Sequence, residues 1–268
     1  MIVGICGLPR KGKTALLTYF AIQSMLDDSH YIDSIHKIKE LNDGGYNFSY
    51  PPKRHVVYSN YDILLHSYER GTLPTYKFNP FYMGLPNPQH KTLLFPPHAQ
   101  FFITEGQRPL NSRMSFVLSD FVSQFYETGG HYGCNFAIDC QRLNLLDANV
   151  RELMELVIEV QSVEFKENRA GECVKTTWHT REFNSCFDYD NYLASGKTKG
   201  GKVNKYVYKG DIRKMYNSFY CFPNYLKDAK ERDFTYQLSH IVDNSVVAIE
   251  QFNLENPTTV PSTYYKKR

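Results

Sequence analysis

The feature that most constrains the fold lies at the start of the chain. A short apolar run, Met1–Cys6 (MIVGIC), leads into GLPRKGKT at Gly7–Thr14, and apolar residues then recur near helical spacing in ALLTYFAIQSML. The middle segment fits the pattern G-x-x-x-x-G-K-[ST]. A strand, a glycine-bounded loop and a helix in this order form a nest of backbone amides for phosphate oxygens, strengthened by the helix dipole. We therefore expect an α/β fold with a nucleotide site at this loop.

Each part of the loop has a chemical role. Gly7 and Gly12 allow backbone conformations and a close approach that a Cβ atom would block. Lys13 places a positive charge on the β- and γ-phosphates, and the hydroxyl of Thr14 is positioned to ligate Mg²⁺. The expected cofactors are therefore ATP and Mg²⁺; the alternative is a glycine- and lysine-rich turn without a ligand. The expected nucleotide-binding residues follow the loop into the helix: Gly7, Leu8, Pro9, Arg10, Lys11, Gly12, Lys13, Thr14 and Ala15.

Composition excludes several other classes of protein. The chain has 268 residues, of which 42% are hydrophobic and 22% charged, so we expect a folded protein built on one large domain. One domain plus an appendage is the alternative for a chain of this length. The formal charge of +3 neither indicates nor excludes nucleic-acid binding. The six cysteines form no CxxC pair, which favours reduced buried thiols over a zinc site or a disulfide framework. No apolar run approaches the ~20 residues of a membrane-spanning helix, and the apolar start does not resemble a signal peptide.

The acidic partner of a phosphate loop is expected at the tip of a later strand. Ala99–Glu105 (AQFFITE) reads as that strand. Its last residue, Glu105, occupies the position of the acid that orients the attacking water. The usual pattern ends Asp-Glu, but here Thr104 stands where the metal-proximal Asp is expected. A hydroxyl can still bind a Mg²⁺-bound water, yet it brings no negative charge. The alternative is an edge strand that ends in an exposed Glu.

A further strand, Cys134–Gln141, is expected beside the phosphate-loop strand. Gln141 at its tip is a candidate γ-phosphate sensor, and Asp139 just before it is an alternative acid. Arg151 lies on a short helix, Asp147–Arg151, with Asp147 as its N-cap. Arg151 either reaches the γ-phosphate of a neighbouring subunit or pairs with Glu155 one helical turn away. The expected catalytic residues are Lys13, Glu105, Gln141 and Arg151.

The remaining segments give a coarse outline of the chain. We expect a loop with one helical turn near 35–41, a strand at 54–61, a short helix at 62–70, a proline- and aromatic-rich insertion at 71–97, and a helix at 119–128. Residues 152–165 move into a buried strand, and 157–187 then suggest an antiparallel β extension. Gly196-Lys197-Thr198 repeats part of the phosphate motif but lacks its spacing, so it is read as a basic loop. The basic and aromatic stretch Lys197–Lys214 suits either a single-stranded DNA groove or a solvated β-hairpin.

The order of these motifs resembles a known family. The motifs are GLPRKGKT, VVYSNYD, FFITEGQ with Arg113 downstream, GGHYGCNFAIDCQ followed by DANVREL, and KGDIRKMYNSFY. Over roughly residues 1–220 they resemble the Zot-like P-loop ATPases of filamentous phages, which include the zonula occludens toxin and the phage gene I assembly protein. The resemblance implies a RecA/FtsK-like core, with a mostly parallel sheet flanked by helices. It also implies that Gly7, Gly12, Lys13 and Thr14 bind nucleotide, and that Glu105, Gln141 and Arg151 are the strand-end acid, the sensor and the following Arg.

The resemblance also implies a function and a setting. Such ATPases drive the extrusion of coat-wrapped single-stranded DNA, so we expect a homo-oligomeric ring that works with DNA and with coat or assembly proteins. We expect it in the host cytoplasm or at the cytoplasmic face of the inner membrane, with any membrane link supplied by a missing segment or a partner. The alternatives are a nucleotide-gated assembly scaffold with weak hydrolysis and a soluble viral genome-packaging ATPase. The expected domains are 1–165 (core), 166–222 (β-rich extension of the same domain) and 223–268 (polar tail).

Overall fold

The computed structural model describes residues 1–48, 50, 57–63, 65–67, 71–73, 76–77, 86–87, 92–93, 95–111 and 125–217. The insertion expected at 71–97 lies largely outside these residues, and the tail expected at 223–268 lies entirely outside them. Of the helix expected at 119–128, residues 125–128 are described and are helical.

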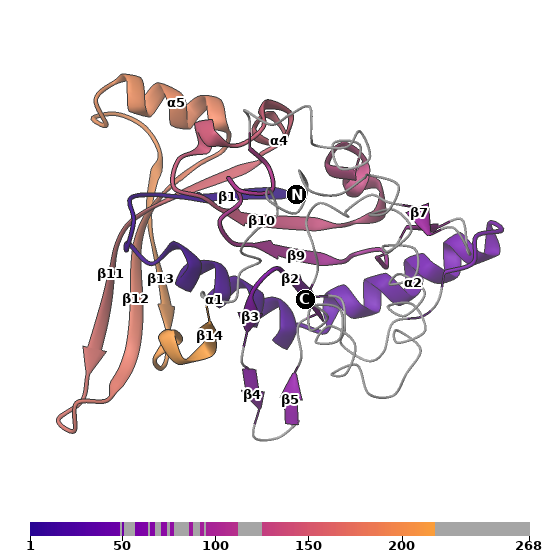
Figure 1. Ribbon diagram of the computed structural model, residues 1–268, viewed down its shortest axis with the longest axis horizontal. Helices are drawn as coiled ribbons and strands as arrows, with labels where there is room; N and C mark the ends of the chain where they lie inside the picture. Colours follow the sequence, from indigo (N-terminus) through magenta and orange to yellow (C-terminus); the bar gives the residue numbers. More distant parts are fainter. Residues whose placement is uncertain are drawn as a thin grey trace, which may run out of the picture.

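A single mixed sheet of eight strands forms the centre of the described fold (Figure 1). Six neighbouring strands are parallel: β11 (Leu156–Glu167), β1 (Ile2–Cys6), β10 (Asn135–Asp139), β9 (Gln100–Ile103), β2 (Val57–Ser59) and β6 (Tyr76–Lys77). Two antiparallel strands, β12 (Cys173–Phe183) and β13 (Lys202–Tyr208), continue the sheet beyond β11. The antiparallel extension predicted from the sequence is therefore confirmed, and it shares the sheet of the core.

Besides the helical residues 125–128, four helices and several short elements accompany the sheet in the described chain. The helices are α1 (Lys13–Leu26), α2 (Ser29–Asp43), α4 (Ala148–Glu152) and α5 (Cys186–Ala194). Three short 3₁₀ turns are η3 (Gly129–Tyr132), η4 (Leu143–Leu145) and η5 (Ile212–Met215). Three two-stranded sheets pair β3 (Asp62–Ile63) with β14 (Tyr216–Asn217), β4 (Leu65–Ser67) with β5 (Gly71–Leu73), and β7 (Pro86–Asn87) with β8 (Thr92–Leu93). No helix among the described residues is long and apolar enough to cross a membrane.

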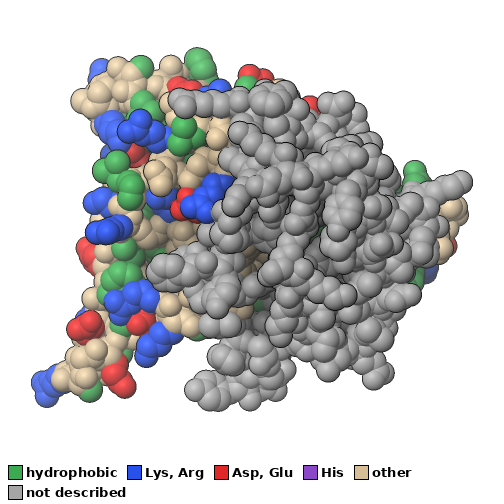
Figure 2. All heavy atoms as spheres, viewed as in Figure 1, with side chains coloured by type: hydrophobic (Ala, Val, Ile, Leu, Met, Phe, Trp, Pro, Cys, Tyr) green, Lys and Arg blue, Asp and Glu red, His purple; other side chains and the backbone are tan. Residues whose placement is uncertain are grey.

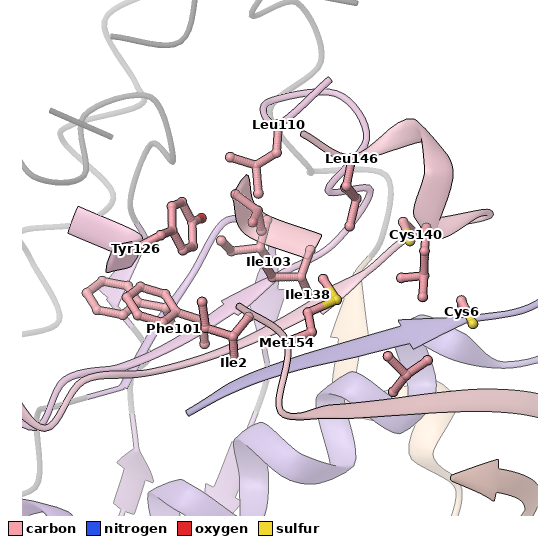
Figure 3. Close-up of a cluster of buried hydrophobic side chains, with 14 of the residues drawn as sticks. Ile2, Cys6, Phe101, Ile103, Leu110, Tyr126, Ile138, Cys140, Leu146 and Met154 are labelled. Carbon is pink, nitrogen blue, oxygen red and sulfur yellow. The ribbon is translucent and has the colours of Figure 1, made fainter. Parts of the chain in front are cut away.

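The central strands are buried on both faces, as their continuous apolar runs require. On one face, α1 packs over Val3, Ile5 and Phe102. On the other face, α4 and α5 cover a second cluster that includes Phe101 and Ile138 (Figures 1 and 3). Because side chains alternate along each strand, neighbouring residues such as Phe101 and Phe102 belong to opposite clusters.

Strand β10 lies between the phosphate-loop strand β1 and the acid-bearing strand β9. Ile5 is level with Asp139, and Ile138 is level with Ile103. Because these strands are parallel, their carboxyl ends meet at one edge of the sheet. The residues that follow them, including Thr104, are therefore brought together at this edge, where ligands bind in open α/β sheets.

Two predictions about local structure are wrong, and one helix was missed. Residues 29–43 form the regular helix α2 rather than a loop with one turn. Its sequence is polar and only Ser34 and Ile38 are buried, so the apolar signal was weak. The described part of 62–70 forms strands β3 and β4 rather than a helix, because β3 pairs with β14, which is about 150 residues away. The helix α5 was not predicted at all; Ser185 caps it by accepting a hydrogen bond from the Asp188 amide.

Candidate nucleotide-binding site

The loop between β1 and α1 needs glycine at both ends. Gly7 has φ 142° and Gly12 has φ 87°, a region that disfavours other residues. A Cβ atom added at Gly7 would lie 2.7 Å from the carbonyl oxygen of Val160, and one at Gly12 would lie 2.9 Å from Cγ1 of Val163. Both neighbours belong to β11. This strand therefore forms a wall beside the loop that leaves no room for a side chain at either glycine.

The start of α1 offers unpaired backbone donors. The Leu16 amide donates the first helical hydrogen bond, to the Gly12 carbonyl at 3.0 Å, so the amides of the preceding three residues have no partner within the helix. The N-cap Gly12 has no side chain to satisfy them. Lys13 is buried, and its Nζ donates to the Leu8 carbonyl at 3.2 Å, across the loop. This arrangement of amides around one lysine suits a phosphate chain.

A tryptophan on β12 also contacts the phosphate loop, and the sequence analysis missed this contact. Trp178, the single tryptophan of the chain, is fully buried on β12 and donates from Nε1 to the Gly12 carbonyl at 3.1 Å. Its ring also lies 5.6 Å from that of Tyr19 on α1. The antiparallel extension is therefore attached directly to the phosphate loop. Nothing in the sequence indicated this partner, because the contact joins residues 166 apart.

Thr104 faces the phosphate loop from the tip of β9. Its Oγ1 lies 3.2 Å from Oγ1 of Thr14. The side-chain amide of Asn60 holds the Thr104 backbone at both ends, since its Oδ1 accepts from the Thr104 amide at 2.8 Å and its Nδ2 donates to the Thr104 carbonyl at 2.9 Å. Asn60 is a second residue that sequence reasoning did not single out, because the contact depends on how β2 lies beside β9.

Asp139 is the last residue of β10, which lies between the phosphate-loop strand β1 and strand β9, and it is fully buried. Its Oδ2 accepts from the Thr104 hydroxyl at 3.0 Å, and its Oδ1 accepts from the Glu105 amide at 2.9 Å. Burial raises the pKa of Asp139 to about 6, while hydrogen bonds from the Glu105 amide and from the hydroxyls of Thr14 and Thr104 oppose that rise. The carboxyl group weighed from the sequence as an alternative acid thus contacts both sides of the site.

Glu105 sits on a constrained turn that directs its side chain. Its φ is 52°, an uncommon conformation for a residue with a long side chain. The turn is held because the Gly106 amide donates to the Asp139 carbonyl at 2.7 Å, and a Cβ atom at Gly106 would lie 2.3 Å from Cγ2 of Ile138. The Glu105 carboxylate accepts a hydrogen bond from the side-chain amide of Gln107. Such local strain is typical of functional positions.

Gln141 and Arg142 follow β10 at the edge of the sheet that carries the phosphate loop. The Cys140 amide still pairs with the Ile5 carbonyl at 2.9 Å, and the next two residues are exposed. Arg151 is different, because α4 leads to the opposite edge, where the Glu155 amide donates to the Ile2 carbonyl at 3.0 Å (Figure 1). The structure therefore does not bring Arg151 to the phosphate loop of its own chain.

The structure, which describes both residues, also does not show the ion pair between Arg151 and Glu155 that was the alternative prediction. Its Nε is buried and has no hydrogen-bond partner among the described residues. Glu155, the alternative partner weighed from the sequence, instead lies 3.4 Å from the amino terminus of Met1.

The second Gly-Lys-Thr triplet forms no phosphate loop. It follows α5 rather than joining a strand to a helix, and Lys197 has φ 64°. The Nζ of Lys197 contacts Oε1 of the buried Glu159 at 2.7 Å. The triplet is thus a turn held by an ion pair, in agreement with its interpretation as a basic loop.

The oxygen atoms at the strand tips fit a hard divalent cation. No group of three or more His, Cys, Asp or Glu side chains in the described part of the chain could hold a metal without other ligands. Mg²⁺, however, is commonly bound by one or two protein oxygens together with substrate phosphates. The hydroxyls of Thr14 and Thr104 and the Asp139 carboxylate form a donor set of this kind.

No protein-family model and no curated protein matches this chain. It is similar to the crystal structure of the N-terminal domain of zonular occludens toxin from Neisseria meningitidis, with 18% identity, a TM-score of 0.45, and coverage of 81% of this chain and 98% of that chain. It is also similar to the genome packaging NTPase of Sulfolobus turreted icosahedral virus 2 in complex with ATP-gammaS, with 11% identity, a TM-score of 0.34, and coverage of 76% and 96%.

The architecture of this chain agrees with the predicted fold class. A phosphate loop follows β1, β10 separates it from the acid-bearing β9, and the parallel strands place all three tips at one edge. The core is a mostly parallel sheet flanked by helices, with the phosphate-loop motif between β1 and α1, and the antiparallel strands β12 and β13 extend it.

Proposed function

We propose that this protein is an ATPase that works as a homo-oligomer and couples ATP hydrolysis to virion assembly or to the movement of nucleic acid. One observation carries the proposal. The phosphate loop and the tip of β9 meet, with the hydroxyls of Thr14 and Thr104 3.2 Å apart and the acid Glu105 next in the chain. This meeting point lies at the carboxyl edge of a parallel sheet, where a triphosphate bound by the loop would present its terminal phosphate to the acid.

Each residue then has a defined task. Lys13 and the amides at the start of α1 bind the phosphates, and Lys13 would exchange the Leu8 carbonyl for a phosphate oxygen. Thr14, with Thr104 through water, would hold Mg²⁺; when bound, this ion neutralises charge that develops on the phosphates. Glu105 orients the attacking water, and Gln141 at the tip of β10 contacts the γ-phosphate.

An oligomer would complete the site from a neighbouring subunit. The residues after β10 are exposed at the edge that carries the phosphate loop, which makes Arg142 a candidate for this contact. Arg151 lies at the opposite edge and could act only from another copy. Contact between opposite edges of successive subunits is a head-to-tail arrangement, which closes into a ring when the rotation permits.

Single-stranded DNA and coat or assembly proteins are the proposed partners, as the sequence resemblance implies. Figure 2 shows lysine and arginine side chains scattered over the β11–β13 side of the molecule, with acidic and hydrophobic side chains between them. Lys202 and Lys205 on β13 are exposed. This mixed surface is compatible with a strand of DNA and equally with a solvated hairpin.

A second candidate function is a nucleotide-gated scaffold that hydrolyses ATP poorly. The specific observation that favours it is Thr104, since a hydroxyl at this position brings no charge to the metal. A scaffold would bind ATP and change its assembly state without rapid turnover.

Steady-state ATP turnover tests the proposal and separates the two candidates. The wild-type chain should hydrolyse ATP, and Lys13→Ala should lower turnover on the order of 10³-fold because the charge on the transferred phosphoryl group loses its partner. Lys197→Ala, in the second triplet, is the matched control and should retain turnover. Stimulation by single-stranded DNA or coat protein would indicate a motor, and unchanged slow turnover with nucleotide-dependent assembly would indicate a scaffold. Turnover in Lys13→Ala equal to that of the wild type would refute the assignment of the loop.

A further inference from the structure

We propose that Asp139, on the strand between the phosphate loop and the acid-bearing strand, supplies the carboxylate that supports the Mg²⁺ of the bound nucleotide. This inference rests on the proposed function and assigns a residue to the metal side of that same site. The role normally expected of an aspartate at position 104 has passed to the neighbouring strand, and Thr104 links the two.

The register of the sheet places Asp139 beside Thr104, at the end of the sheet that carries the phosphate loop. Asp139 is level with Ile5 on one side, and the preceding Ile138 is level with Ile103 on the other. Asp139 therefore stands beside Thr104, one strand closer to the phosphate loop. Since neighbouring strands are ~4.8 Å apart, the carboxylate has moved by one strand spacing toward Thr14, not away from it.

The contacts of Asp139 join the expected metal-binding hydroxyls. Its Oδ2 accepts from Thr104 Oγ1 at 3.0 Å, and Thr104 Oγ1 lies 3.2 Å from Thr14 Oγ1. All three atoms are oxygens, which are the ligands that Mg²⁺ prefers. Thr14 is the last residue of the phosphate loop, whereas Leu8, whose carbonyl oxygen accepts from Nζ of Lys13, lies near its start.

Asp139 also lacks a protein cation. It is fully buried, and none of the ion pairs among the described residues includes its carboxylate. Burying a carboxylate without an opposite charge is costly, so such groups are usually paired or coordinate a metal. A cation that arrives with the nucleotide would supply the missing charge.

A structural role alone would leave part of this geometry unexplained. Holding the Glu105 turn needs only one acceptor atom, and Oδ1 already provides it by accepting from the Glu105 amide at 2.9 Å. An asparagine could do the same. The second oxygen, Oδ2, is directed to the hydroxyl pair beside the loop, where a charge is useful for a cation.

Asp139→Asn tests the inference, because it keeps an acceptor for the Glu105 amide and removes the charge. The full chain is titrated by calorimetry with a nonhydrolysable ATP analogue, once with Mg²⁺ and once with EDTA. Mn²⁺ binding in the presence of the analogue is followed by electron paramagnetic resonance. We expect affinity in EDTA to be retained, while the gain from Mg²⁺ and the affinity for Mn²⁺ fall about ten- to hundredfold. Asp147→Asn, which changes another buried carboxylate that caps α4, is the matched control and should leave both unchanged.

Two outcomes would overturn the inference: a full Mg²⁺ gain in Asp139→Asn, or equal losses with and without the ion, which would indicate support of the Glu105 turn alone. If Asp139→Asn does not fold, Thr104→Asp decides. An unchanged or smaller Mg²⁺ gain in Thr104→Asp supports Asp139 as the existing carboxylate, and a larger gain overturns it. If the wild-type chain binds no analogue in either buffer, the proposed function itself fails; if it binds the analogue and Asp139→Asn behaves identically, only this inference fails.

Discussion

The phosphate loop and the strand tips that face it are held by different kinds of contact. The loop packs closely against a wall formed by β11, where a Cβ atom on Gly7 would meet the Val160 carbonyl oxygen and one on Gly12 would meet the Val163 side chain, and Trp178 donates one hydrogen bond to the loop. The strand tips are held by a network of polar groups, since Asn60 and Asp139 satisfy the backbone and hydroxyl of the segment that carries Glu105.

The difference predicts how each side responds to change. A closely packed wall acts through shape, so an added atom is harmful there. A buried polar network is effective only when every member is satisfied, so the loss of one partner leaves several groups unpaired. Changes at the strand tips should therefore affect chemistry and stability together, whereas changes in the wall should act through the position of the loop.

The largest effect is expected at the acid of the strand tip. Glu105→Gln keeps the size of the side chain but removes the charge that orients water, so ATP turnover should fall on the order of 10²-fold or more. Nucleotide affinity, measured by calorimetry, should stay near that of the wild type. Glu164→Gln, an exposed carboxylate beside His179, is the control and should retain turnover. Equal turnover in Glu105→Gln and the wild type would remove Glu105 from the catalytic residues.

On the wall side, Gly12→Ala should be the most harmful small change. The new methyl group would meet Val163, and the φ of 87° would be strained for alanine. We expect the free energy of unfolding to fall by about 2 kcal/mol, as measured by urea denaturation, together with weaker nucleotide binding. Gly130→Ala is the matched control, because a Cβ atom there meets nothing within 4 Å and should be nearly neutral. If both variants were equally stable, the wall would not determine the shape of the loop.

The two sides also differ in what the sequence could predict. The phosphate loop is contiguous, so its spacing alone located Lys13 and Thr14, and the order of apolar runs placed Glu105 at a strand tip. The link from Asp139 to Thr104 joins residues 35 apart, and it depends on the register between β9 and β10. Periodicity does not determine register between strands. The sequence pattern therefore identified Asp139 only as an alternative acid, and it gave no indication that Asn60 binds the backbone of Thr104.

Asn60 offers a direct comparison of the two kinds of support. Asn60→Ala leaves the buried amide and carbonyl of Thr104 without their partners, and we expect a loss of about 2 kcal/mol in the free energy of unfolding. Trp178→Phe removes one hydrogen bond from the other side and also leaves a small cavity, because Trp178 is fully buried. The Gly12 carbonyl still accepts from the Leu16 amide, so we expect about 1 kcal/mol from the lost hydrogen bond, with the cavity cost in addition. Urea denaturation measures both losses, and ATP turnover and nucleotide titration separate them: Asn60→Ala should lower turnover through the Glu105 segment, and Trp178→Phe should act on nucleotide affinity through the loop. The opposite assignment would reverse the contrast between the polar tips and the packed wall.

The smallest effect is expected at the second Gly-Lys-Thr triplet, which provides a control for the first. Lys197→Ala breaks the contact with Glu159, and because Lys197 is half exposed, the loss of stability should be at most about 1 kcal/mol. The hydrogen bond to Glu159 raises the pKa of Lys197 above its ordinary value of 10.5. The part of the stabilisation that depends on the lysine charge is therefore complete at neutral pH and is lost as pH rises through the raised pKa, so wild type and variant should converge in alkaline solution. Denaturation from neutral to alkaline pH, with Lys199→Ala as control, measures this convergence; a difference that persisted above the raised pKa, or a loss of nucleotide binding in Lys197→Ala, would show that the triplet has another role.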